Sequence, residues 1–124
     1  MRKDVAEKWV AALRSGAYTQ TRCVLRDVVG VVDSYCCLGV LCDLHRKSCP
    51  TGSWDGDGGY TTKARGARAY NTEFDVPTPE VVRWAELDEA NPTMPGGTIA
   101  ELNDIYGKTF DELADLIEAS WESM

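Results

Sequence analysis

The sequence predicts an α+β fold: a single compact domain over residues 1–124, mainly helical, with a central buried helix and one or two short antiparallel β-hairpins. Three observations predict it. The nearly uncharged run YCCLGVLCDL, residues 35–44, has apolar side chains at helical spacing on two adjoining faces. Residues 22–34 are rich in valine with Gly30 in the middle, as in a short hairpin or a bulged strand. Two capping boxes begin helices in the last third of the chain.

The first element is an amphipathic helix over residues 2–14. Val5, Trp9 and Leu13 form its inner face, and Gly16 follows where a left-handed residue ends a helix.

In the valine-rich segment, Leu25 and Cys23 are expected to face the core. Arg22 and Arg26 then lie on the other side. The helix of residues 36–45 comes next, and we expect the first, third and last helices to enclose it.

Residues 48–68 lose periodicity and predict a surface loop with one small hairpin, in which Trp54 pairs with Tyr60. Order returns with a helix over residues 78–87, capped by Thr78 and begun by Pro79.

The capping boxes then begin a short helix at Thr98 with Glu101 and a longer one at Thr109 with Glu112. The longer helix carries one apolar stripe, formed by Phe110, Leu113, Ala114, Ile117 and Trp121.

The composition is that of an ordinary globular protein, with 44% hydrophobic and 27% charged residues in 124. Glu7 and Lys8 interrupt the only apolar stretch near the N-terminus, and no run is long enough to cross a membrane. We therefore expect a cytoplasmic protein that does not bind membranes. Five cysteines, an odd number, are then expected to be reduced thiols.

The net charge of −7 is unevenly distributed. Residues 1–68 hold eleven Lys or Arg and seven Asp or Glu, whereas residues 69–124 hold two and thirteen. Either the two halves attract each other, within the chain or across a dimer, or the basic half presents an anion site. Genomic nucleic acid is disfavoured as a partner of an acidic chain, and a homo-oligomer is expected.

Candidate metal sites and nucleophiles have plainer explanations. Cys42, His45 and Cys49 have a spacing that zinc could use, but the cysteines also suit core packing and His45 suits a cationic helix C-terminus. Asp55 and Asp57 begin like a calcium loop that then lacks its later ligands. We expect no metal, no cofactor and no catalytic residue, because the single histidine gives a cysteine nucleophile little support.

The remaining candidate is the loop with its basic flank, where aromatic rings and cations suit a base and its phosphates. The predicted ligand-binding residues are Trp54, Tyr60, Lys63, Arg65, Arg68 and Tyr70. The alternative is a solvated loop whose arginines pair with the acidic half.

The motifs ALRSGAYTQ, YCCLGVLCDL, PEVVRWAEL and LNDIYGKTFDELADLIEASW occur in this order. Together they resemble a group of small proteins encoded by bacteriophages and prophages. The resemblance implies an accessory protein that acts in a bacterial cytoplasm. Combined with the aromatic and basic loop, it suggests a non-enzymatic sponge for a nucleotide-derived signal of host defence. Two other classes stay open: a module that docks on a host or phage protein through its acidic surface, and a small hydrolase.

Overall fold

The computed structural model describes residues 1–63 and 70–124, and these residues confirm the α+β class. They form five α-helices and eight short strands. The helices are α1 (Lys3–Arg14), α2 (Cys37–Ser48), α3 (Pro79–Ala85), α4 (Ile99–Asp104) and α5 (Phe110–Ser120), followed by a 3₁₀ turn, Trp121–Ser123. The strands are β1 (Thr19–Gln20), β2 (Arg26–Asp27), β3 (Ser34–Tyr35), β4 (Gly52–Trp54), β5 (Tyr60–Lys63), β6 (Tyr70–Glu73), β7 (Thr93–Met94) and β8 (Gly97–Thr98).

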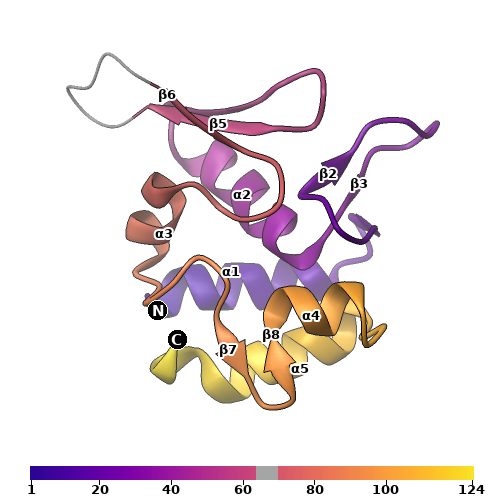
Figure 1. Cartoon of the computed structure of the whole chain (residues 1–124). Helices are drawn as coiled ribbons and strands as arrows, with labels where there is room; N and C mark the ends of the chain where they lie inside the picture. The colour runs from indigo at the N-terminus through magenta and orange to yellow at the C-terminus, as the bar shows by residue number, and fades with distance from the viewer. Residues whose placement is uncertain (64–69) are drawn as a thin grey trace.

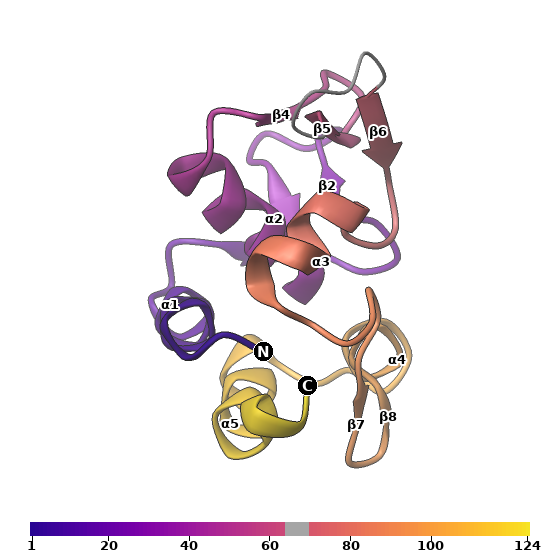
Figure 2. The same cartoon turned by 90° about the vertical axis from the view of Figure 1, so that its left-hand side faces the viewer.

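Helix α1 lies between the other helices, with α2 on one side and α5 on the other (Figure 1). Figure 2 shows α1 and α5 side by side and nearly end-on. Helix α2 packs chiefly against α1, α3 and α4, whereas α5 packs chiefly against α1. The last helix therefore does not enclose α2 in the way the sequence predicted, because the apolar stripe of α5 meets α1 first.

Small sheets flank the helices. The hairpin predicted within residues 22–34 is confirmed, because β2 and β3 pair antiparallel, and β1 joins them parallel to β3. Strands β4, β5 and β6 form an antiparallel sheet in which Trp54 lies opposite Tyr60, as predicted. The third pair, β7 and β8, is a short hairpin before α4.

The predicted helix boundaries hold where the local signals were strong. Both capping boxes are present, and Gly16 has the expected positive φ of 75°. Thr78 does precede α3, but its hydroxyl accepts a hydrogen bond from Thr62 and makes no side-chain cap. Helix α3 ends at Ala85, because Glu86 has left-handed backbone angles.

The placement of Cys23 was wrong. Leu25 is fully buried as predicted, but Cys23 is exposed and has a φ of 68°. A residue in the left-handed region turns the chain, so the strict alternation of a strand does not apply before β2.

Asn103 ties four segments together inside the protein. Its side chain donates to the carbonyl of Thr21 and accepts from the amide of Cys37 and the side chain of Gln20. Gln20 also donates to the carbonyl of Lys108. This buried network fixes β1, the start of α2, the end of α4 and the approach to α5.

Among the described residues, no helix combines the length and apolar character needed to cross a membrane.

Candidate functional site

The organising group of the candidate site is Asp43, which lies on α2 and is only 4% exposed. Its carboxylate accepts hydrogen bonds from Tyr18 Oη at 2.6 Å, Arg46 Nε at 2.7 Å and Trp54 Nε1 at 2.9 Å. Burial alone would raise the pKa of Asp43, but hydrogen bonds from Arg46, Tyr18 and Trp54 outweigh it and lower the pKa. Asp43 therefore stays charged and holds side chains from three segments.

These side chains belong to a row of aromatic rings that crosses β3 and β4. The ring centroids of Tyr18 and Tyr35 are 5.1 Å apart, those of Tyr35 and Trp54 are 5.8 Å apart, and those of Trp54 and Tyr60 are 4.8 Å apart. Each pair meets edge to face, an arrangement that aromatic quadrupoles favour. Tyr18, Tyr35 and Trp54 are half-buried residues, whereas Tyr60 is fully buried.

Cations lie against two of these rings. The guanidinium carbon of Arg26 is 5.5 Å from the Trp54 ring centroid, and Lys47 Nζ is 5.3 Å from that of Tyr18. Arg26 also forms an ion pair with Asp33 across the β2–β3 hairpin. We call Tyr18, Tyr35, Trp54, Arg26 and Lys47 the aromatic–basic face.

Tyr60 lies beneath this face and is fully buried. Its hydroxyl is 2.7 Å from Nδ1 of His45, which is itself buried. Burial raises the pKa of Tyr60 and lowers the pKa of His45, so both are neutral near pH 7. His45 is therefore a core residue and not a cationic cap of the α2 C-terminus, the role that the sequence allowed.

Two other predicted ligand-binding residues, Lys63 and Tyr70, form a separate pair. Lys63 and Tyr70 sit opposite each other at the ends of β5 and β6, with Lys63 Nζ 5.6 Å from the Tyr70 ring centroid. Tyr70 is 63% exposed. Arg65 and Arg68 lie outside the described residues. The structure thus joins Trp54 and Tyr60 in one cluster, and Lys63 and Tyr70 in another.

The cysteines of α2 and its N-cap are packed into the core. Burial raises the pKa of Cys36 to about 12 and raises the pKa of Cys37 and Cys42 well above the ordinary value. Such thiols are weak nucleophiles, because the thiolate is the reactive form. Within residues 1–63 and 70–124, no group of three His, Cys, Asp or Glu side chains is placed to hold a metal ion.

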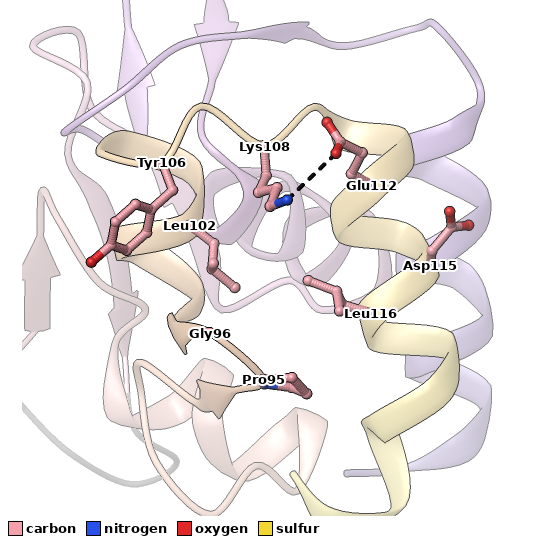
Figure 3. Close-up of a pocket in the computed structure, with 8 residues that line it drawn as sticks. All are labelled: Pro95, Gly96, Leu102, Tyr106, Lys108, Glu112, Asp115 and Leu116. Carbon is pink, nitrogen blue, oxygen red and sulfur yellow. Dashed lines mark ion pairs between the residues drawn. The ribbon is translucent and has the colours of Figure 1, made fainter.

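A second feature, which the sequence did not predict as a site, is a hollow of about 560 Å³ between α4, α5 and the β7–β8 turn. We call it the acidic groove. Figure 3 shows Leu102 and Leu116 lining it, with Pro95 from the turn below them. Glu112 lies at its edge, 3.6 Å from Lys108 Nζ.

Sequence reasoning missed Tyr18, Tyr35, Arg26 and Asp43 because their contacts join segments that are distant in the sequence. Asp43 was only the break in an apolar run, yet its partners Tyr18 and Trp54 come from segments 25 and 11 residues away. A charged residue inside the otherwise uncharged run of residues 35–44 was the one available sign, since a buried carboxylate needs donors.

The described residues form a small α+β fold with two surface features, the aromatic–basic face and the acidic groove. The chain belongs to the family described as Domain of unknown function (DUF8296), whose model matches residues 1–121. No curated protein and no solved structure is detectably similar to it.

Proposed function

We propose that this protein is a phage-type accessory protein that binds a nucleotide-derived signal of host defence without transforming it. The observation that carries the proposal is the aromatic–basic face, where half-exposed rings stand in a row with cations beside them. Any nucleobase can stack on an aromatic ring, because every base has a flat π face. Cations attract the phosphates that the base carries.

The anchoring at Asp43 supports this role. Tyr18, Trp54 and Arg46 are hydrogen-bonded to one buried carboxylate, so they lose little further freedom when a ligand arrives. Arg46 and Lys47, which carry two positive charges, both form ion pairs with the single carboxylate of Asp43. One of these charges is in excess and remains for an anion.

The chemistry of the neighbouring groups supports binding over turnover. The thiols of α2 have raised pKa values, and the imidazole of His45 is buried against Tyr60. A nucleophile or general base needs an accessible group with a pKa near the working pH. We accordingly assign no catalytic residue.

Calorimetric titration with cyclic dinucleotides and ADP-ribose derivatives tests the proposal. Tyr35→Ala should weaken binding about tenfold, because stacking contributes about 1–3 kcal/mol per base. Tyr106→Ala is the matched control, since Tyr106 is an exposed tyrosine at the acidic groove. Failure of the whole panel to bind would refute the proposal, and so would equal effects of the two variants.

Chromatography of the ligand after release separates a sponge from a hydrolase. Intact ligand supports a sponge, whereas a cleaved product would favour the hydrolase class. The setting that we propose is the bacterial cytoplasm, and we propose a homo-oligomer, whose formation sedimentation would test.

A second candidate function is a module that docks on a host or phage protein through its acidic surface. The acidic groove favours it, because an apolar hollow with carboxylates at its rim is typical of a surface that holds a protein segment.

A further inference from the structure

We infer that the acidic groove binds a basic, amphipathic segment of another protein. The inference rests on the second candidate function, docking on another protein, and states the chemistry of the segment that would bind. It does not depend on the aromatic–basic face. Its observations concern the shape of the groove, the charge around it and the apolar residues at its rim.

The groove offers an apolar anchor point. Leu102 comes from α4, Leu116 from α5 and Pro95 from the β7–β8 turn, so three elements converge on one hollow (Figure 3). A volume of about 560 Å³ suits one or two large side chains. Tyr106, which lines the groove, is 58% exposed, and Ile105, which precedes it in the chain, is 69% exposed. Exposed apolar residues that adjoin a hollow indicate a surface that is covered by a partner.

The charge around the groove is strongly negative. Residues 86–124 contain ten Asp or Glu and one Lys, which is Lys108. Glu112 and Asp115 line the groove, and Glu118 follows one turn later on α5. A docking segment with lysines or arginines beside its apolar anchors would complement this rim.

The basic half of the chain offsets only part of this charge. Among the described residues, the ion pairs that join the two halves both use Arg14, which contacts Asp115 and Glu118. The remaining pairs are formed within one half or the other. Lys108, which also lines the groove, contacts Glu112. Two positive charges thus face the three carboxylates, which leaves one negative charge in excess for an external cation.

A fluorescent synthetic peptide is a suitable probe. It should have about fourteen residues, leucines at i, i+3 and i+4 spacing and lysines elsewhere. We expect it to bind, to weaken as salt rises, and to perturb the amide NMR signals of Leu102, Tyr106 and Leu116. A peptide with the leucines replaced by serine should bind at least tenfold more weakly, because it lacks the anchor.

Two groove variants and one control make the test specific. Glu112→Gln removes a groove charge but keeps the capping box, which accepts either residue, and should weaken binding about threefold. Leu116→Asn removes an apolar wall and should weaken binding about tenfold. Asp75→Asn removes the same charge from the exposed segment between β6 and α3 and should leave affinity unchanged. Thermal melting verifies that each variant is folded.

Several results would overturn the inference. One is equal weakening by Asp75→Asn and Glu112→Gln, which would indicate general attraction between opposite charges. Others are a peptide affinity that Leu116→Asn leaves unchanged, a peptide that does not bind at all, or NMR changes confined to other parts of the protein. Salt-sensitive self-association that Leu116→Asn abolishes would identify a second copy of the chain as the occupant instead. Nucleotide titration should be unaffected by Leu116→Asn, so the two sites fail or succeed separately.

Discussion

Gly39→Ala should destabilise the protein strongly, although alanine is the better helix former. Gly39 lies in the first turn of α2, directly against the backbone of Leu25. A β-carbon at position 39 would overlap the carbonyl oxygen of Leu25 and lie 2.7 Å from its carbonyl carbon. Backbone atoms cannot rotate away as a side chain can, so β2 and α2 would have to separate.

The cost can be worked from three contributions. Overpacking against backbone costs about 3 kcal/mol at the upper end of its usual range. The hydrogen bond that the amide of Cys36 donates to the carbonyl of Leu25 at 3.2 Å is also disturbed, which adds about 1 kcal/mol. Alanine returns about 1 kcal/mol through helix propensity. We therefore expect the free energy of unfolding to fall by about 3 kcal/mol.

Urea unfolding followed by tryptophan fluorescence measures this change. The matched control is Gly56→Ala, because a β-carbon at Gly56 meets no atom within 4 Å and its free energy of unfolding should change by less than about 0.5 kcal/mol. If Gly39→Ala is as stable as Gly56→Ala, the close approach of Leu25 to α2 is wrong. The placement of Arg26 and Tyr35 beside Trp54 would then be wrong too, since both follow from that approach.

Three further predictions concern buried groups. Burial lowers the pKa of His45 below 6.5, so as the pH falls the unfolded chain binds a proton at His45 before the folded protein does. The free energy of unfolding should therefore keep its full value above pH 6.5 and fall as the pH drops below it. His45→Gln should flatten this part of the pH dependence in a series of unfolding curves. Asn103→Ala should lower the free energy of unfolding by about 2–4 kcal/mol in urea titration, because the buried carbonyl of Thr21 and the buried amide of Cys37 both lose this partner. A loss below about 1 kcal/mol would contradict the network. A thiol reagent should modify the exposed Cys23 quickly in the native protein, but Cys36, Cys37 and Cys42 only after denaturation, which mass spectrometry would show. Fast modification of all four thiols in the native protein would contradict the burial of the last three.

The parts of the fold that the sequence predicted are those whose signals lie within a few residues. Thr98 and Thr109 each need only a glutamate three positions later to begin a helix, and both do. The pairing of Trp54 with Tyr60 likewise depends on one short turn. In contrast, the exposed position of Cys23 depends on a backbone angle that no side-chain pattern encodes.

The candidate site was harder because it is made by packing. The prediction placed Tyr60 on a binding loop, but contact with His45 on α2 puts its ring in the core. Leu102 and Leu116 were visible as apolar positions of two helices, yet their convergence on one hollow depends on how α4 meets α5. Periodicity states which face of a helix is apolar, and it does not state which part of that face the neighbouring helix leaves uncovered.

The ion pairs of the described residues bear on the cause of the charge asymmetry between the two halves of the chain. The sequence allowed the two halves to attract each other within the chain, but among the described residues Arg14 alone joins them by ion pairs. These pairs are exposed, and exposed pairs contribute about 0–1 kcal/mol each. Ion pairs of that size among the described residues account for little of the contrast between a balance of +4 in one half and −11 in the other. Under the two proposals made above, the asymmetry serves two surfaces that select different partners: a face with an excess cation beside its rings, and a groove that repels the anions that the first face attracts.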